Sequence, residues 1–372
     1  MQVSTTKESL ATPLGLVFGA ADTRGTVPML ATVLMKTAND KLSMLCSDLG
    51  MVARTQTNCE IKDAGEIAVD ARRLYDLIRA VPERQSLDLA VDGKGKLIVK
   101  SGRSRFQLPT LPAADYPRLT PKQDARVSVN INGKRLLEMV DQVSSAMAEA
   151  DVRIIFNGML VSLADGRLWL IASDGHRINI TSEPIPGSET ITKTEMILPR
   201  KSVGLMRRLL SHSDHVKLII GSADLQLSLA NGSLLFAKGI EGQYVSWGKV
   251  IPQSEQTATV DTVRLSTALA MIEAMVEDGG KKDALSRAVD ITFGKGIITA
   301  QKGETALTEI EAACESDPVE ISINIGYLRD AVSAIGVGAE GLTFGFSEPN
   351  KPITVRPQGA EYPLAVVMPM RR

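Results

Sequence analysis

The chain ends in Tyr362-Pro363-Leu364-Ala365-Val366-Val367-Met368-Pro369-Met370-Arg371-Arg372. Residues 366–370 are almost wholly apolar, although the ends of chains usually fray. An apolar terminus has to pack into the fold or offer its surface to another molecule. Two interpretations therefore stand at this point: a last β-strand that closes a sheet, or a strand and tail that together wall a groove for a peptide of another protein.

Similar features recur along the 372-residue chain at about one third of its length. Each third opens with apolar residues at positions i, i+4 and i+7 behind a Thr, Asn or Asp cap, which is the pattern of an amphipathic helix. The three sets are Leu10, Leu14 and Val17 after Thr6; Leu136, Val140 and Val143 after Asn132; and Leu265, Leu269 and Ile272 after Asp261. A second helix is predicted in each third, over residues 70–80, 200–210 and 324–334.

Between the two helices of each third lie short β-branched runs that predict strands. They cover residues 29–35 and 41–46, 154–161 and 168–172, and 288–293 and 297–300. Turns such as Asp165-Gly166 between them have the chemistry of hairpins. We therefore predict an α+β protein of three repeated domains, each with two helices on one face of a mainly antiparallel sheet. Polar, unpatterned segments divide these domains into residues 1–125, 126–253 and 254–372.

Composition excludes several classes of protein. Apolar residues make up 44% and charged residues 23%, as in an ordinary globular protein, and a net charge of −1 excludes a polycation. Aromatic residues, at 4%, are too few for a protein that reads single strands by base stacking. Cys46, Cys59 and Cys314 fit neither a disulfide framework nor a metal site. We therefore predict no metal and no cofactor. Because no signal peptide or membrane span is expected, we also predict a cytoplasmic protein.

Basic residues recur on the second helices of the first two thirds. They are Arg72, Arg73 and Arg79 in the first helix, and Lys201, Arg207 and Arg208 in the next. Arg72 and Arg79 lie seven residues apart, as do Lys201 and Arg208, so each pair shares a helix face. A solvated face would explain one such helix, but the recurrence favours a surface that meets phosphates independently of sequence. The third of these helices keeps only Arg329.

The chain contains no convincing motif for catalysis. Residues 92–96 (Asp-Gly-Lys-Gly-Lys) are too short for a phosphate-binding loop, and we expect a hairpin tip. Residues 212–215 (His-Ser-Asp-His) have no further ligand nearby and indicate a surface turn. Ser173, Asp174 and His176 are neighbours in sequence, which is not the geometry of a catalytic triad. We expect this turn to present its backbone and His176 to a partner, and an enzyme that uses Asp174 and His176 stays as an alternative.

Several further motifs lie in register along the full chain. They are Ser173-Asp174-Gly175-His176-Arg177, Val366-Val367-Met368-Pro369-Met370-Arg371, Ser101-Gly102-Arg103-Ser104-Arg105-Phe106, residues 110–117, Arg24 with Pro28, Asp151-Val152-Arg153 and Asn157-Gly158-Met159-Leu160. Together they resemble the bacterial sliding clamp family, the beta subunit of the replicative DNA polymerase III holoenzyme. The resemblance implies a non-catalytic processivity factor of DNA replication: a head-to-tail homodimer whose clamp domains close into a ring around duplex DNA.

The resemblance also implies a hydrophobic groove, between the second and third domains, that binds peptides of the polymerase, the clamp loader and other partners. Its matching positions are Phe156, Ser173, Gly175, His176, Arg177, Ile178, Val245, Lys249, Val250, Val366, Val367, Met368, Pro369, Met370 and Arg371. The predicted DNA-binding residues are Arg24, Arg72, Arg73, Arg79, Arg153, Lys201, Arg207 and Arg208. The predicted dimer interface brings Arg103, Arg105, Phe106 and Leu108 of one copy to Ile272 and Glu304 of the other, with Glu309 as a further acidic partner.

The chain departs from the family pattern at four positions. Val245 stands where the family often has proline, Lys249 where it often has arginine, and Phe156 where it often has leucine. Ala150 occupies a position that is a DNA-contacting glutamine in some relatives. We therefore expect a groove of different shape and one side chain fewer on the DNA. A peptide-binding scaffold that no longer encircles DNA stays as an alternative, because the third domain lacks a basic helix face.

Overall fold

The computed structural model describes residues 1–117, 126–212, 214–276 and 284–370. The chain forms two compact units, Met1–Leu137 with Lys201–Gly239, and Glu138–Arg200 with Ile240–Arg372. The middle third of the chain is divided between them, because its strands at 215–238 join a sheet of the first unit and its strands at 158–199 join a sheet of the second. The domain boundaries near residues 125 and 253 remain a prediction.

The predicted helices are confirmed. They are α1 (Lys7–Phe18), α2 (Ala71–Ala80), α3 (Gly133–Ser144), α4 (Arg200–Leu210), α5 (Thr262–Ala274) and α6 (Ile325–Ile335). The side chain of Thr6 accepts a hydrogen bond from Ser9 N, and that of Asp261 accepts one from Arg264 N. Each cap satisfies a backbone N–H that its helix leaves unpaired. Within the described ranges, none of the helices is both long and apolar enough to cross a membrane.

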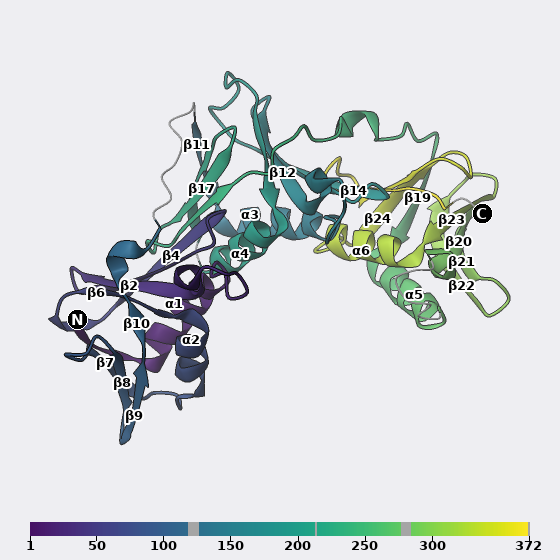
Figure 1. Ribbon diagram of the computed structural model, residues 1–372. Helices are drawn as coiled ribbons and strands as arrows, with labels where there is room; N and C mark the ends of the chain where they lie inside the picture. The colour runs from purple at the N-terminus through teal and green to yellow at the C-terminus, as the bar shows by residue number, and fades with distance from the viewer. Residues whose placement is uncertain (118–125, 213, 277–283, 371–372) are drawn as a thin grey trace. The chain divides into compact units, whose positions relative to one another are not determined.

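The first unit contains two antiparallel sheets (Figure 1). Its strands are β1 (Gln2–Thr6), β2 (Thr32–Ala38), β3 (Lys41–Ser47), β4 (Met51–Asn58), β5 (Glu60–Asp63), β6 (Glu66–Asp70), β7 (Ser86–Val91), β8 (Leu97–Ser101), β9 (Ser104–Leu108), β10 (Thr110–Leu111), β11 (Val127–Asn132), β16 (His215–Ile220), β17 (Asp224–Leu229) and β18 (Leu234–Lys238). One sheet has the order β5-β1-β7-β8-β9, and the other has the order β10-β6-β2-β3-β4-β18-β17-β16-β11. Helices α1 and α2 lie side by side, with Phe18 stacked on Tyr75.

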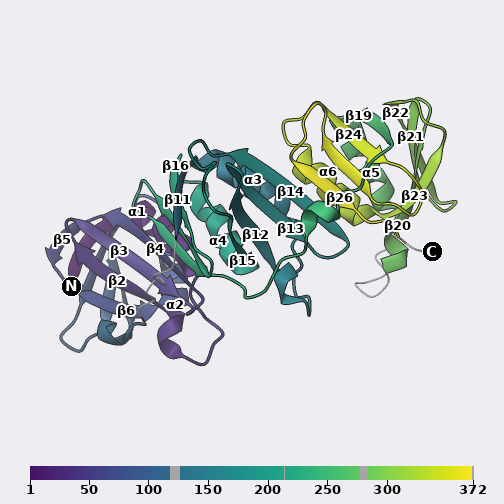
Figure 2. The same ribbon diagram turned by 90° about the horizontal axis from the view of Figure 1, so that it is seen from above.

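The strands of the second unit form one hydrogen-bonded sheet, and they are coloured from teal to yellow in Figure 2. Its strands are β12 (Gly158–Ala164), β13 (Arg167–Ser173), β14 (Arg177–Pro184), β15 (Thr194–Pro199), β19 (Gln256–Asp261), β20 (Ala288–Gly294), β21 (Ile297–Lys302), β22 (Ala306–Cys314), β23 (Val319–Asn324), β24 (Gly341–Phe346), β25 (Ile353–Pro357) and β26 (Leu364–Val367). Their order is β15-β12-β13-β14-β26-β25-β24-β19-β22-β21-β20-β23. β14 pairs with β26, with Ile178 opposite Val366, so strands of the middle and last thirds share one ladder of hydrogen bonds.

Two predicted strands begin later than the sequence indicated. Short 3₁₀ helices at Pro28–Ala31 and Ile154–Asn157 precede β2 and β12. Pro28 has its φ fixed near helical values and has no N–H to donate to a ladder, so it favours a helical turn over a strand. The apolar run at residues 154–157 offered no such signal, because a short apolar run does not distinguish a strand from a helical turn.

The core of the last third carries three aromatic rings in contact, of which Phe293 and Phe346 are stacked and Phe344 is tilted against Phe293. Phe293 lies 5.4 Å from Phe344 and 4.3 Å from Phe346 between ring centroids, and all three side chains are buried. α5 and α6 pack their buried faces into the same cluster, which also includes the last residue of β26, Val367. The terminal strand is therefore tied to the main core of this region and does not fray.

Candidate functional site

The apolar tail is both a closing strand and an exposed surface. β26 is buried and pairs with β14 on one side and β25 on the other. Beyond the strand, Met368 N donates to His176 O at 3.0 Å, and Met370 N donates to Ser322 O at 2.8 Å. The side chain of Met368 is 39% exposed, so its thioether is available to a ligand. Arg371 lies outside the described residues.

The turn between β13 and β14 is fixed by hydrogen bonds within itself. Ser173 Oγ donates to Arg177 O at 2.8 Å and accepts from Gly175 N at 3.1 Å. Asp174 Oδ1 accepts from the backbone N–H groups of His176 and Arg177, at 2.9 and 3.1 Å. Gly175 has a φ of 88°, which favours glycine. The hydroxyl and the carboxylate serve the turn, which argues against an enzyme built on Asp174 and His176.

The resemblance places Arg177 in the groove, but its side chain is turned into the protein and is only 10% exposed. Nε donates to Asp174 Oδ2 at 3.0 Å, Nη1 to Asp330 Oδ2 at 2.6 Å, and Nη2 to Ser145 O at 2.6 Å. The guanidinium also lies over the ring of Tyr327, 4.6 Å from its centroid. We call these five residues the Arg177 network, and it joins the β13–β14 turn to the end of α3 and to α6.

The other predicted groove positions divide into a buried floor and an exposed rim. Phe156, Ile178 and Val366 belong to one core cluster with Tyr244, and Phe156 meets Tyr244 edge to face at 6.2 Å between ring centroids. Val245 is half-buried against the same cluster. The exposed rim consists of Gly175, His176, Lys249, Val250 and Met368, with Pro369 and Met370 half-buried beside it. An apolar floor with a few polar groups at its edge suits the apolar side chains of a bound peptide.

Tyr327 on α6 adjoins this rim, and the sequence analysis does not predict it. Its ring stacks on that of His176, with 6.0 Å between centroids and 17° between planes. Burial raises the pKa of the Tyr327 hydroxyl, so this group stays a neutral donor at physiological pH. In the sequence, Tyr327 stands out only as an aromatic residue on a predicted helix of a chain with few aromatics. That pattern does not reveal a contact with His176, which is far away in the sequence.

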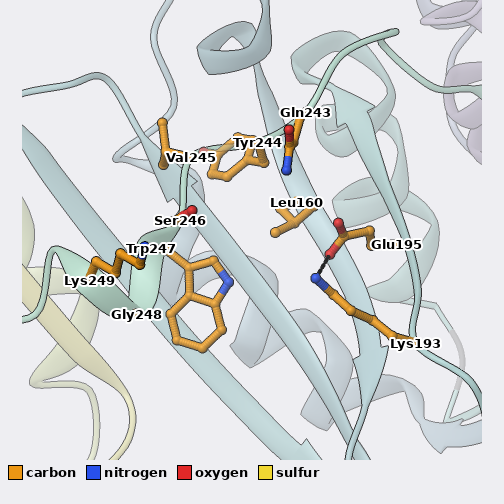
Figure 3. Close-up of a pocket in the computed structure, with 10 residues that line it drawn as sticks. All are labelled: Leu160, Lys193, Glu195, Gln243, Tyr244, Val245, Ser246, Trp247, Gly248 and Lys249. Carbon is orange, nitrogen blue, oxygen red and sulfur yellow. Dashed lines mark ion pairs between the residues drawn. The ribbon is translucent and has the colours of Figure 1, made fainter.

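A separate hollow of about 270 Å³ lies beside residues 243–249, the segment that carries two of the predicted groove positions (Figure 3). Leu160 lies at its base, the indole of Trp247 at one side, and the ion pair of Lys193 with Glu195, 2.7 Å apart, at the other. Sequence reasoning missed this hollow because its lining comes from three separate segments of the chain.

Both tryptophans of the chain meet at this place. The ring centroids of Trp169 and Trp247 are 5.1 Å apart, and Tyr362 meets Trp169 edge to face at 5.1 Å. Arg167 lies over the Trp169 ring at 5.7 Å and donates to Ser182 Oγ. The three aromatic residues pack against the groove floor, so they extend its apolar cluster towards the surface.

On α2, two of the predicted DNA-binding arginines rest on aromatic rings. Arg72 lies over the ring of Phe18 at 5.3 Å, Arg79 lies over the ring of Tyr75 at 5.5 Å, and the two rings stack at 4.9 Å between centroids. A guanidinium that stacks on a ring by its face keeps its N–H edge available to donate. Arg73, which follows Arg72, is also exposed.

On α4, the predicted residues are exposed, and the contacts of Lys201 and Arg208 show where these two side chains lie. Lys201 Nζ pairs with Asp48 Oδ2 at 2.5 Å. Arg208 lies against the end of α1, since a Cβ atom added at Gly19 would fall 2.5 Å from its Nη2. The partial negative charge at a helix C-terminus favours a cation there. Arg24 and Arg207, the other two predicted DNA-binding residues of this unit, are also exposed.

Arg153 lies against the β13–β14 turn and not on a helix face. Its guanidinium donates to Asp151 at 3.0 and 2.9 Å and to Asp174 O at 3.3 Å, and it covers the ring of Phe156 at 4.6 Å. The hydrogen bond from Arg153 lowers the pKa of Asp151 to about 2, so the pair stays ionised at physiological pH. These contacts place Arg153 beside the β13–β14 turn, and its contact with DNA remains a prediction.

Apart from Ile272, the predicted dimer residues lie at or beside two strand edges that no other described strand covers. Among the described strands, β9 pairs only with β8, and its Arg105 and Phe106 are exposed, Phe106 by 39%. β22 pairs with β21 over residues 306–311 but with β19 only at residues 312–314, so no strand of the described ranges pairs with the other side of its first half. Leu307 is 60% exposed on this half, and Glu309 is also exposed. Unpaired strand edges of this kind are sites where a second chain can add.

Two of the predicted interface residues need correction. Ile272 is only 2% exposed and belongs to the core cluster of the last third, so its side chain has no surface to offer to a second copy. The exposed apolar residues of the same helix are Val263, at 73%, and Met271, at 55%, and the C-cap residue Met275 is 53% exposed. Leu108 is 9% exposed and is held within its own sheet. The exposed predictions Arg103 and Glu304 lie just outside β9 and β22.

Metal ligands do not gather anywhere in the part of the chain that the structure describes: no group of three or more His, Cys, Asp or Glu side chains there could hold an ion.

The fold and the site together define a class. A chain of repeated α+β domains, with helices on antiparallel sheets and with basic residues exposed on α2 and α4, has the architecture of a DNA clamp. Family models of the DNA polymerase III beta subunit match along the chain: the N-terminal domain at residues 1–120, the central domain at 130–245 and the C-terminal domain at 248–371. The chain belongs to this family.

Similar proteins support the assignment. The beta sliding clamp of Pseudomonas aeruginosa is 30% identical, and that of Escherichia coli is 28% identical, each over 100% of both chains. Among solved structures, a sliding clamp from Pseudomonas aeruginosa bound to griselimycin has a TM-score of 0.90 at 29% identity, again over 100% of both chains. One from Bartonella birtlesii, also bound to griselimycin, has a TM-score of 0.89 at 26% identity.

Proposed function

We infer that the chain is the processivity clamp of a replicative DNA polymerase. Two copies close head to tail into a ring around duplex DNA, and the groove tethers the polymerase and other partners by short peptides. The clamp has no catalytic role of its own. The observation that carries this function is the match of the whole chain, in three consecutive domains, to the beta subunit family. Cytoplasmic action with DNA is proposed on the same ground, and the free thiols of Cys46, Cys59 and Cys314 agree with it.

The decisive experiment is retention on DNA. A loaded ring should stay on nicked circular DNA and leave linear DNA by its ends, because the ring holds DNA by topology and not by tight contacts. Equal loss from both substrates would contradict a closed ring. It would instead favour a peptide-binding scaffold that does not encircle DNA.

The groove that we propose is formed by the tail, the β13–β14 turn and residues 245–250. Its floor is the cluster around Phe156, Ile178 and Val366, and its rim carries His176 and Met368. Apolar area removed from water contributes roughly 25 cal/mol per Å² to binding. Polar groups of the rim fix the direction of the peptide. We therefore expect partner peptides with a polar anchor, such as glutamine, followed by bulky apolar residues.

The DNA-facing surface that we propose is formed by the cations of α2 and α4. Replacing both Arg79 and Arg208 with Glu should weaken the binding of duplex DNA about equally for all sequences. Each phosphate that the protein no longer neutralises reduces the slope of log affinity against log salt by roughly 0.9. Fluorescence anisotropy of a labelled duplex over a series of salt concentrations measures both effects.

A control with the same change of charge separates local effects from net charge. Lys41 on β3 and Lys62 on β5 are exposed and lie on strands of the same unit. Replacing both with Glu should leave most of the salt slope intact. If this control and the helix variant reduce the slope equally, the cations of α2 and α4 do not face the DNA.

The dimer interface that we propose joins β9 of one copy to the open half of β22 of the other. Arg103 and Arg105 would then meet Glu304 and Glu309, and Phe106 would be covered. Two such contacts, each between different surfaces, close a two-subunit ring. Met275, the C-cap residue of α5, replaces Ile272 as the helical contribution, because it is apolar, exposed and only three residues from Ile272.

A further inference from the structure

We propose that Arg177 is a positioning residue of the groove: it holds the two walls of the groove in register and does not contact the peptide. This inference rests on the proposed function, because the groove belongs to the clamp. It changes the role that the resemblance gives to Arg177.

The hydrogen-bonding capacity of Arg177 is largely used inside the protein. Three of its guanidinium nitrogens donate, one each to Asp174 Oδ2, Asp330 Oδ2 and Ser145 O, at 3.0, 2.6 and 2.6 Å. Its backbone N–H donates to Asp174 Oδ1, and its carbonyl accepts from Ser173 Oγ. With 10% of the side chain exposed, little surface is left for a ligand.

The partners of Arg177 come from both sides of the groove. Asp174 and Ser145 belong to the middle third, whereas Asp330 and Tyr327 lie on α6 of the last third. A charge-assisted hydrogen bond with a short distance, such as that to Asp330, is stronger than a neutral one. Because the guanidinium is planar and its donors point in fixed directions, it can hold several partners in one arrangement. Arg177 therefore fixes α6 against the turn that carries the rim.

This arrangement also sets the position of the rim. His176 precedes Arg177, its carbonyl accepts from Met368 N at 3.0 Å, and its ring stacks on Tyr327 at 6.0 Å. The guanidinium of Arg177 also holds Tyr327, at 4.6 Å from its ring centroid. Removal of the Arg177 guanidinium would release Tyr327 and His176 together, and with them the first residue of the tail. The groove would then have to be ordered by the peptide, which weakens binding.

The experiment is a double-mutant cycle in the full-length protein with the variants Arg177→Gln, Asp330→Asn and both together. The probe is a short fluorescein-labelled peptide of glutamine followed by leucine and phenylalanine, made with and without an added aspartate, and its affinity is measured by fluorescence polarisation. We expect each single variant to weaken peptide binding about tenfold. The double variant should bind as well as the single variant of lower affinity, because both substitutions remove the same interaction between Arg177 and Asp330. The loss of affinity should be the same for both peptides.

Hydrogen exchange provides a readout that does not depend on the peptide. The amide of Met368, which donates to His176 O, should exchange faster in both single variants than in the parent. Asp330 is 52% exposed, so Asp330→Asn keeps the fold even where Arg177→Gln is poorly folded. The control is Glu348→Gln, an exposed acid of the same unit, which should match the parent in both measurements.

Two results would overturn the proposal. Parent-like binding and exchange in Asp330→Asn, beside weak binding in Arg177→Gln, would mean that the guanidinium contacts the peptide itself. If Arg177→Gln weakened the binding only of the peptide with the added aspartate, the guanidinium would likewise contact the peptide, through that aspartate. Failure of the parent to bind either peptide would contradict the groove, and faster exchange at Met368 would then still support the role of Arg177 in holding the tail.

Discussion

A clamp that ends at Val367 should lose peptide binding by more than 100-fold and remain a dimer. Deleting residues 368–372 removes the exposed side chain of Met368 and the backbone anchors of Met368 and Met370 on His176 and Ser322. Fully burying a methionine side chain contributes about 1.5–3 kcal/mol, and removing two such side chains corresponds to at least a 100-fold change in affinity. Fluorescence polarisation with a labelled partner peptide measures the change.

The dimer should survive this deletion because β26 itself remains. The strand is buried and pairs with β14 and β25 along residues 364–367, so its place in the sheet does not depend on the tail. Analytical ultracentrifugation checks this point. Retained peptide binding in the truncated protein would mean that the apolar terminus is only a closing strand, and the groove would have to be sought elsewhere.

Replacing Phe106 with Glu should convert the dimer to monomers at low micromolar concentration. Phe106 is 39% exposed on an open edge, so the change costs its own subunit little, but it puts a carboxylate against the acidic side of β22. Like charges brought together at an interface cost several kcal/mol, which raises the dimer Kd by at least about 100-fold. Sedimentation velocity gives the oligomeric state directly.

The matched control for this variant is Val27→Glu. Val27 is an apolar residue of the same unit, is 49% exposed, and precedes the turn Pro28–Ala31, outside the proposed pairing of β9 with β22. The same change of charge should therefore leave the dimer largely intact. A second variant, Leu307→Glu on β22, should dissociate the dimer as Phe106→Glu does. If the dimer persisted in both Phe106→Glu and Leu307→Glu, the proposed pairing of β9 with β22 would be wrong.

Most of the architecture follows from local chemistry and could be predicted. The caps Thr6, Asn132 and Asp261 and the apolar spacing behind them fix where helices begin, because both act within one or two turns of the chain. The same reasoning should have removed Ile272 from the interface. As the i+7 member of the set that starts at Leu265, it was already assigned to the buried helix face, and the structure confirms that burial.

The site was less predictable because its geometry depends on contacts between distant segments. The motif at residues 173–177 indicates a functional turn, but not that Arg177 points inward to Asp330 and Ser145. Nor does spacing reveal that Arg72 and Arg79 rest on rings of two different helices. A pattern within one element reports which face is buried; it does not report which residue of another element meets that face.

The tryptophan pair gives the protein an optical signal of its own. Trp169 and Trp247 are the two tryptophans of the chain, with ring centroids 5.1 Å apart, and they pack against the cluster that forms the groove floor. The tryptophan fluorescence of the protein therefore reports on the surroundings of this one pair. Any shift of residues 243–249 when a peptide settles on Val245 changes the distance between the two indoles, and with it the wavelength and intensity of fluorescence. Peptide binding to the groove can thus be followed in unlabelled protein by its intrinsic tryptophan fluorescence.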